Sequence, residues 1–180
     1  RVVQLVGSMN PLNSSVYADE LAKTLAMKLD GSAYILRAPM IVDNSEIRDM
    51  MLNESHIKEV LSLARKVDIA IVGIGAMDSN SILLSSGCIS EGELEEIRKR
   101  GGVGDILGRF YDLNGKPVSS SLDNRIIGIG IEELKEIPYV IGVAGGKNKT
   151  RAILGALRMG VLNSLVTDEQ TARELLNTGG

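Results

Sequence analysis

The sequence predicts an α/β fold with a mostly parallel β-sheet and helices on both faces. Short apolar runs alternate along the chain with segments whose apolar residues recur at helical spacing. One run, residues 68–74 (DIAIVGI), is almost continuously apolar, as in a strand that is buried on both faces. Another, residues 139–144, meets a Gly145-Gly146 break and continues as a helical pattern, which predicts a strand, a tight turn and a helix.

The first third of the chain predicts two strands and three helices. The strands are expected at residues 2–6 and 33–36, and the helices at residues 14–29, 46–52 and 54–66. The apolar faces expected of the first and third helices are Ala18, Leu21, Ala22, Leu25 and Leu29, and Ile57, Val60, Leu61 and Ala64.

The rest of the chain continues the alternation. Ser90 and Glu93 form a capping box for an acidic helix, and Thr167 with Gln170 predicts a cap for the last helix. Asn114-Gly115 predicts a hairpin turn. The further strands and helices are expected at residues 126–131 and 162–166, and at residues 132–136 and 167–176.

Composition narrows the class of protein. A chain of 180 residues that is 44% hydrophobic and 24% charged is typical of one globular domain. The net charge of −3 argues against a nucleic-acid surface on this chain, because phosphate neutralisation needs clustered Lys and Arg. Cys88 is the only cysteine, so an intrachain disulfide is excluded. We find neither a membrane-spanning run nor a signal peptide and expect a cytoplasmic location.

The Gly145-Gly146 turn is the first candidate binding site. A glycine turn before a helix directs free backbone N–H groups, at the positive end of the helix dipole, towards an anion. Lys147, Lys149 and Arg151 add positive charge at the same place, which suits a phosphate or a carboxylate. The alternative is an ordinary strand-to-helix connection with solvated lysines.

Asp105 is the second candidate. It stands among four glycines in residues 101–108, so one carboxylate lies where larger side chains have been cleared. It is suited to accept hydrogen bonds from sugar hydroxyls. Equally, it is suited to hold its own turn by accepting from local N–H groups, and both interpretations stay open.

Polar residues after two other strands are weaker candidates. Ser8 and Asn10 follow the first strand, where α/β proteins place ligand groups, while Asn13 or Ser14 is suited to cap the next helix. His56, the only histidine, has no partners for a triad or a metal site and is expected on the surface. Residues that could hydrogen-bond a polyol, unless they belong to a flexible loop, are Asp78, Ser79, Asn80 and Ser81.

Several segments in one order resemble a known family. They are VGIG at residues 72–75, GCISEGEL at 87–94, GGVGDILGRFYDLNG at 101–115, RIIGIGIEEL at 125–134, and residues 140–176. Over nearly the whole chain they resemble the effector-binding domain of the SorC family of bacterial sugar-responsive transcription regulators.

The resemblance implies a fold similar to sugar-phosphate isomerases and CoA transferases. It also implies one effector-binding domain over residues 1–180 that binds a phosphorylated sugar, without metal, cofactor or catalytic residue. We expect a helix-turn-helix and the start of the effector domain to precede Arg1, so that operator DNA is contacted only through that missing part. The parent protein is expected to be a homo-oligomer.

The resemblance also places residues at the ligand. Its AGGxxK element corresponds to Gly145, Gly146 and Lys149, and its GxxGD element corresponds to Asp105. Lys149 would donate to phosphate or hydroxyl oxygen, and Asp105 would accept from sugar hydroxyls.

Gly75 and Ala76 are expected to line the same crevice. Some relatives hold an aldehyde sugar as a Schiff base on a lysine after the third strand. Residues 76–81 contain no lysine, so we expect reversible, noncovalent binding.

Two alternatives remain beside the sensor. One is a sugar-phosphate isomerase or deaminase with Asp105 as base and Lys149 as electrostatic stabiliser, although such chemistry usually needs a second acid–base group. The other is an oligomerisation module that uses the apolar face of residues 46–66.

Overall fold

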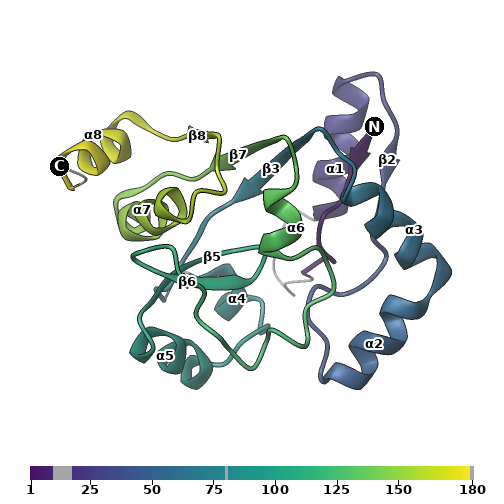
Figure 1. The fold of residues 1–180 in the computed structure, drawn as a ribbon, viewed down its shortest axis with the longest axis horizontal. Helices are drawn as coiled ribbons and strands as arrows, with labels where there is room; N and C mark the ends of the chain where they lie inside the picture. The colour runs from purple at the N-terminus through teal and green to yellow at the C-terminus, as the bar shows by residue number, and fades with distance from the viewer. Residues whose placement is uncertain (10–17, 80, 179–180) are drawn as a thin grey trace. The chain divides into compact units, whose positions relative to one another are not determined.

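The computed structural model describes residues 1–9, 18–79 and 81–178 (Figure 1). The chain forms two compact units. The first comprises residues 1–67 and 121–129, and the second comprises residues 68–120 and 130–180. The prediction that the whole chain is one domain stays a prediction.

In residues 1–9, 18–67 and 121–129, the first unit contains a small parallel sheet and three helices. Val2–Val3 pairs in parallel with Ala33–Tyr34, as the alternation predicts. The predicted strand at residues 126–131 is wrong, because with the described residues this segment makes only single bridges, from Ile126 to Ile41 and from Gly128 to Val6. The elements in chain order are β1 (Val2–Val3), α1 (Ala18–Lys28), β2 (Ala33–Tyr34), α2 (Ser45–Asn53) and α3 (Ser55–Ala64).

The helices of this unit bury different kinds of face. In α3 the predicted face is confirmed, since all four of its apolar residues are buried. For the first helix the prediction is wrong for Ala18 and Leu21 of α1, which are exposed, and for Leu29, which follows the last residue of α1. Leu21 and Leu29 are 64% and 65% exposed. Ala22 and Ala26 are the buried residues of α1. This helix therefore contacts its neighbours through small side chains one turn apart, which leaves the leucines outside.

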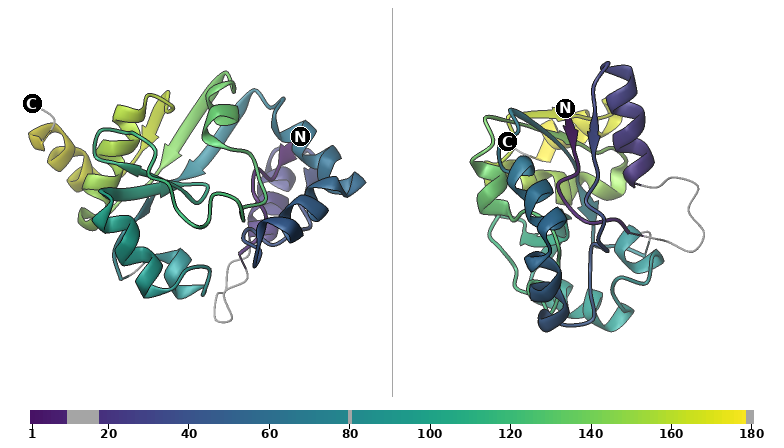
Figure 2. Two further views of the ribbon diagram at one scale, coloured as in Figure 1. Left: turned by 60° about the horizontal axis from the view of Figure 1, so that its bottom comes forward. Right: turned by 90° about the vertical axis from the view of Figure 1, so that its right-hand side faces the viewer.

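The second unit contains two three-stranded sheets (Figures 1 and 2). Strands β3, β7 and β8 are parallel, which confirms the predicted parallel sheet. Strands β4, β5 and β6 are antiparallel. The elements in chain order are β3 (Ile69–Gly73), β4 (Gly75–Ala76), α4 (Ile82–Ser85), α5 (Glu91–Lys99), β5 (Gly102–Ile106), β6 (Arg109–Asp112), α6 (Ile131–Lys135), β7 (Tyr139–Val143), η1 (Lys147–Lys149), α7 (Thr150–Met159), β8 (Ser164–Val166) and α8 (Glu169–Thr178).

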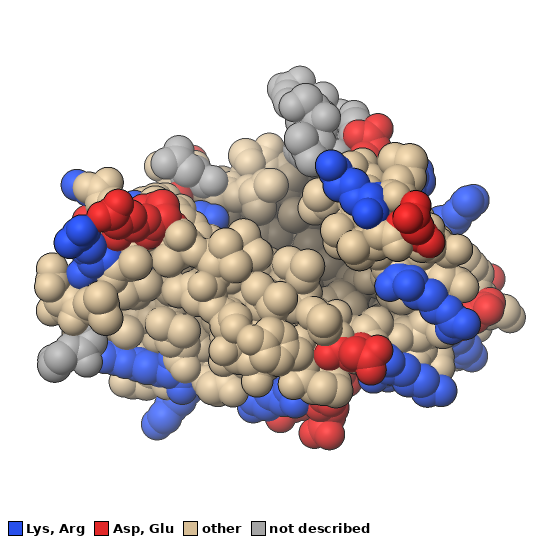
Figure 3. All heavy atoms as spheres, turned by 90° about the horizontal axis from the view of Figure 1, so that it is seen from above, with Lys and Arg blue, Asp and Glu red and all other residues tan. Residues whose placement is uncertain are grey.

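One face of the parallel sheet is exposed. Ile69 and Ile71 of β3 are 57% and 54% exposed, whereas Ala70 and Val72 are buried. The prediction that residues 68–74 are buried on both faces is therefore wrong. The register places both isoleucines on the face that also carries three other exposed apolar side chains, and Figure 3 shows largely uncharged surface there. Those three are Tyr139, Val143 and Val166.

Two helix caps test the capping predictions. The box at α5 is confirmed, because Ser90 Oγ accepts from the Glu93 N–H at 3.2 Å and Glu93 accepts from the Ser90 N–H at 2.9 Å. At α8 the prediction is wrong. The helix begins at Glu169, so Asp168 is the capping residue and accepts from the Thr171 N–H at 2.8 Å. Thr167 Oγ1 is buried and has no hydrogen-bond partner in the part of the chain that the structure describes.

Substitutions in β3 should distinguish its two faces. Val72→Thr places a hydroxyl in the core and should destabilise the protein by about 1–3 kcal/mol. Ile71→Thr, on the exposed face of the same strand, should change stability by only about 0.5 kcal/mol. Urea denaturation of both variants measures the difference. Equal losses would contradict a strand that is buried on one face only.

Candidate functional site

Asp105 lies on β5, opposite Gly75 of β4 in the antiparallel sheet. Its side chain is buried, and its carboxylate accepts a hydrogen bond from the Gly108 N–H at 3.1 Å. Leu107 and Gly108, with φ of 54° and 73°, turn the chain so that this N–H reaches back to the carboxylate. The predicted turn-holding role of Asp105 is confirmed. A role towards a ligand uses the remaining acceptor capacity of the same carboxylate.

Burial controls the charge of this carboxylate. Desolvation raises the pKa of Asp105 to about 6, while the hydrogen bond from Gly108 and the charge of Lys149 act in the opposite direction. Near neutral pH the group therefore changes between an acceptor-only carboxylate and a carboxylic acid that also donates.

Glycine creates the space for Asp105. A Cβ atom at Gly75 would overlap the Oδ1 atom of Asp105, so only glycine permits this approach. On the other side, a Cβ atom at Gly104 would lie 2.6 Å from the Tyr111 hydroxyl. That hydroxyl is buried and donates to the Ala152 carbonyl of α7 at 3.0 Å. Sheet β4-β5-β6 and helix α7 therefore approach each other closely around the carboxylate.

Lys149 reaches the same strand end from η1. Its Nζ atom donates to the Ile74 carbonyl oxygen at 2.9 Å, next to Gly75 in the chain. Its charge lowers the pKa of Asp105, although no direct ion pair joins the two among the described residues. The prediction that Asp105 and Lys149 serve one ligand is thus compatible with their positions at Ile74 and Gly75. Ala76 pairs with Gly104 and is itself buried.

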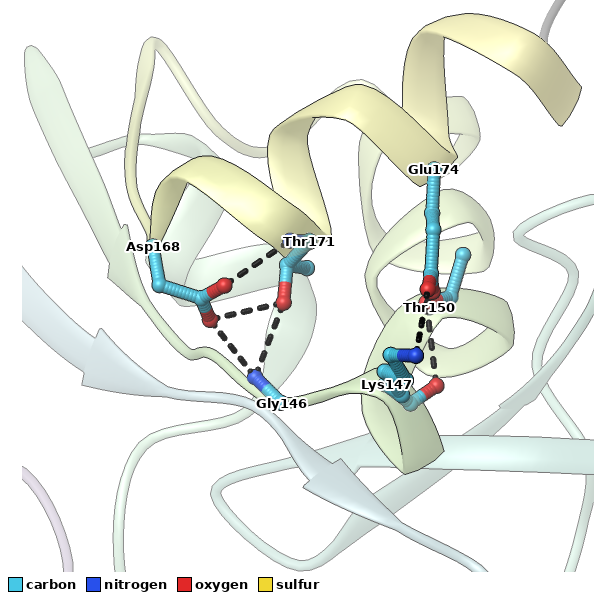
Figure 4. A network of polar contacts seen from close by, with 6 residues as sticks. All are labelled: Gly146, Lys147, Thr150, Asp168, Thr171 and Glu174. Atoms are coloured by element: carbon cyan, nitrogen blue, oxygen red, sulfur yellow. Dashed lines mark hydrogen bonds and ion pairs between the residues drawn. The ribbon is translucent and has the colours of Figure 1, made fainter.

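The glycine turn differs from the prediction in one respect. The Gly146 N–H is not free, because it donates to Asp168 Oδ2 at 2.8 Å and to Thr171 Oγ1 at 2.9 Å (Figure 4). The next two N–H groups, of Lys147 and Asn148, have no acceptor among the described residues. They lead into α7, where the helix dipole favours negative charge.

Asp78 joins this region from the loop after β4. The Asn148 side chain donates to its carboxylate at 2.6 Å. Ser81, another residue of the predicted polyol loop, is buried and donates its N–H to the Asp78 carbonyl at 3.0 Å. Asn80 lies outside the described residues. The part of this loop that the structure describes is therefore held by hydrogen bonds and leads into α4.

Ser8 belongs to the first unit. Its N–H donates to Ala38, its carbonyl accepts from Met40, and its hydroxyl accepts from Gln4 Nε2 at 3.0 Å. Asn10, Asn13 and Ser14 lie outside the described residues. A ligand role for Ser8 stays a prediction.

Other kinds of site find no support in the described part of the chain. His56 is exposed, as predicted. Within residues 1–9, 18–79 and 81–178, no three His, Cys, Asp or Glu side chains are grouped to hold a metal. Over the same residues, each helix is too short or too polar to span a membrane.

The sequence pattern missed Asp168, Thr171 and Tyr111. The first two have a readable signal, since an Asp followed three residues later by Thr at a helix start predicts a cap. That pattern does not show that the same groups bind Gly146. Tyr111 has no such signal, because its contact with Ala152 joins residues 41 positions apart.

These features define an α/β domain with a buried carboxylate and a lysine at one strand end. The protein family described as "Putative sugar-binding domain" matches residues 1–177. The chain belongs to this family, and the resemblance to SorC-family regulators is confirmed.

Individual relatives are transcriptional regulators. The regulator LsrR of Klebsiella pneumoniae is 36% identical over 179 residues, which cover 98% of this chain and 53% of LsrR. The erythritol catabolism regulatory protein EryD of Brucella abortus is 33% identical over 176 residues, covering 98% of this chain and 55% of EryD. The chain spans about half the length of these curated relatives.

Solved structures of transcriptional regulators have a similar fold. The full-length sorbitol operon regulator SorC from Klebsiella pneumoniae has a TM-score of 0.89 at 31% identity, covering 97% of this chain and 57% of that one. The α/β fold is thereby confirmed. The relatives are named as regulators, which agrees with the prediction of a sensing domain and gives no support to an isomerase or deaminase.

Replacing Gly75 should disturb the carboxylate. Gly75→Ala forces the Asp105 side chain to move and should destabilise the protein by about 1–3 kcal/mol. Gly73→Ala is the matched control, because a Cβ there meets nothing within 4 Å and should change stability little. Urea denaturation measures both variants. Adding Asp105→Ala to Gly75→Ala should remove the clash; a double variant as unstable as the sum of both changes would contradict it.

The raised pKa of Asp105 predicts a pH-dependent stability. The folded state holds this proton more tightly than the unfolded chain, so the carboxyl contributes less stability as pH rises from about 4 to about 6. Asp105→Asn removes the ionisation. Relative to the original protein, the variant should gain roughly 2 kcal/mol between pH 4 and pH 7. Urea denaturation at four pH values measures this, and a difference that is independent of pH would contradict it.

Proposed function

We propose that this chain binds a phosphorylated sugar and controls DNA binding by a bacterial transcriptional regulator of which it is the sensing part. The observation that carries the proposal is the placement of a buried carboxylate, Asp105, and a lysine ammonium, Lys149, beside the Ile74-Gly75 strand end. Relatives named for the sorbitol operon and for erythritol catabolism support a sugar or polyol as the ligand class.

The two groups suit the two ends of such a ligand. Ionised Asp105 accepts from sugar hydroxyls, and a buried acceptor left unpaired disfavours analogues that lack them. Lys149 donates to the phosphate as a point charge. The N–H groups of Lys147 and Asn148 add donors for the same anion.

The remaining predicted residues shape this site. Gly75 admits the Asp105 side chain, and we assign Ala76 to the wall behind it. Gly145 and Gly146 form the turn that precedes Lys149. A ligand role for Ser8 is proposed for the first unit by itself.

Ligand binding acts by population shift in this proposal. A ligand that binds one arrangement of the site more tightly than another stabilises that arrangement, and the DNA-binding segment or a second copy responds to it. The helix-turn-helix, the cytoplasmic location and the homo-oligomer are parts of the same proposal. The relatives are transcriptional regulators that extend well beyond the length of this chain, which supports the helix-turn-helix.

A thermal-shift screen against sugars, polyols and their phosphates tests the proposal. A ligand at a hundredfold excess over its Kd stabilises the native state by about 2.7 kcal/mol, which should raise Tm by about 5–10 °C. Lys149→Ala should weaken binding of the phosphorylated ligand roughly tenfold or more, because a charged hydrogen bond is lost. Lys135→Ala, which removes a surface lysine paired with Glu132, is the control and should keep the full shift.

The screen should include the full-length regulator. A shift in the regulator that is absent from this chain would mean that further residues complete the site. A shift that Lys149→Ala and Asp105→Asn leave unchanged would contradict the assigned site. No shift in either protein would contradict the proposed function.

A further inference from the structure

Helix α8 contacts the glycine turn through polar groups. Its one buried residue among those described is Thr171, which is fully buried although its side chain is polar. Leu176 of the same helix is 80% exposed. An amphipathic helix is normally held by a buried apolar face. Here, Ala172 and Leu175 are half-buried, and hydrogen bonds to the turn before α7 add to their packing (Figure 4).

The contacts converge on one backbone N–H group. Gly146 donates to Asp168 Oδ2 at 2.8 Å and to Thr171 Oγ1 at 2.9 Å. The Thr171 hydroxyl donates to the same Oδ2 atom at 2.7 Å, and the Thr171 N–H donates to Oδ1 at 2.8 Å. Asp168 is therefore both the cap of α8 and the acceptor for the turn.

The turn has the shape that this carboxylate requires. Gly146 has φ of 106°, which side chains other than glycine rarely adopt. A Cβ atom at Gly145 would lie 2.5 Å from Asp168 Oδ2. Both glycines are thus explained by the Asp168 side chain, which fixes the direction in which the chain leaves β7.

A second contact holds the start of α7. Glu174, on the next turn of α8 after Thr171, accepts from the Thr150 hydroxyl at 2.9 Å. Its other oxygen lies 4.0 Å from the Lys147 Nζ atom. Helix α8 therefore contacts both ends of the three-residue η1 segment that includes Lys149.

We propose that Asp168 and Thr171 are positioning residues for anion binding. By accepting the Gly146 N–H they hold the turn so that the N–H groups of Lys147 and Asn148, and the Lys149 side chain, face one anion. This inference rests on the proposed function and assigns it two residues that do not touch the ligand. It also links α8 to the site, because an anion that orders the turn stabilises the docking of α8.

Asp168 keeps its negative charge around neutral pH, which suits a residue that holds the turn. The hydrogen bond from the Thr171 hydroxyl, followed by those from the Thr171 and Gly146 N–H groups, lowers the pKa of Asp168 to about 2. A carboxyl with a lowered pKa contributes stability above its unfolded value and loses it only as the pH falls from about 4 towards about 2. The Asp168 carboxylate that accepts from the Gly146 N–H is therefore fully charged at neutral pH.

The test uses inorganic phosphate as the probe and NMR as the readout. Thr171→Val keeps the shape and the Asp168 cap but removes the hydroxyl. We expect hydrogen exchange of the Gly146 amide to become roughly tenfold or more faster, and phosphate binding, followed at the Lys147 and Asn148 amides, to weaken by a similar factor. Asp168→Asn should act in the same direction.

Two variants serve as controls. Thr171→Ser restores the hydroxyl and should recover both the slow exchange of Gly146 and the phosphate affinity. Glu169→Gln changes a neighbouring acid that pairs only with Arg173 on the exposed side of α8, and it should leave both readouts unchanged.

The outcomes separate this role from the proposed function. Faster Gly146 exchange in Thr171→Val and Asp168→Asn, with phosphate affinity unchanged, would overturn the positioning role alone. If phosphate does not shift the Lys147 and Asn148 amides of the unmodified protein, the phosphate part of the proposed function fails, and the positioning role fails with it.

Discussion

An ionised carboxylate loses several kcal/mol of hydration when it is moved out of water, and Asp105 is only 8% exposed. The second unit compensates for this with a hydrogen bond of 3.1 Å from the Gly108 N–H and with the positive charge of Lys149. The compensation is partial, since the pKa of Asp105 remains raised. A buried acceptor with unused capacity is a group that gains from a ligand hydroxyl, and this is the physical reason for proposing a ligand there.

The strands and the helix around Asp105 are packed so that its carboxylate fits between them. Antiparallel pairing of β4 with β5 brings Gly75 opposite Asp105, and the absence of a side chain at Gly75 makes the room. Close packing of Gly104 against Tyr111 and Ala152 then brings α7 onto the sheet. Helix α7 starts beside Lys149, so the packing that accommodates the Asp105 carboxylate also brings the Lys149 side chain towards it.

Two carboxylates of the second unit, Asp105 and Asp168, lie in opposite environments. Asp105 is buried with few donors, which raises its pKa, whereas Asp168 accepts three hydrogen bonds at a helix start, which lowers its pKa. Around neutral pH, Asp168 is a fixed charge and Asp105 is close to its titration range. In the proposed site, the carboxylate assigned to the sugar hydroxyls is therefore close to its titration range, whereas the carboxylate that binds the glycine turn keeps its charge.

The sequence alone determined the class of fold, the order of most elements and two of the principal candidates. Hydrophobic periodicity decides which segments become strands and helices, and it is local, so the parallel strands β3, β7 and β8 and the buried face of α3 were predictable. Asp105 and the glycine turn beside Lys149 became candidates because glycine-rich turns next to charged residues are local patterns too, and the family resemblance then singled out Lys149. The family resemblance added the expected class of ligand, a phosphorylated sugar.

Tertiary structure decided what each pattern is used for. The exposed face of β3, the exposed leucines of α1 and the bridges of residues 126–129 depend on which neighbours cover a segment, and composition does not reveal neighbours. The Gly146 N–H looked free because its acceptors, Asp168 and Thr171, lie 22 and 25 positions later in the chain. Local sequence can propose a binding turn, but only long-range packing decides which of its donors are already bound.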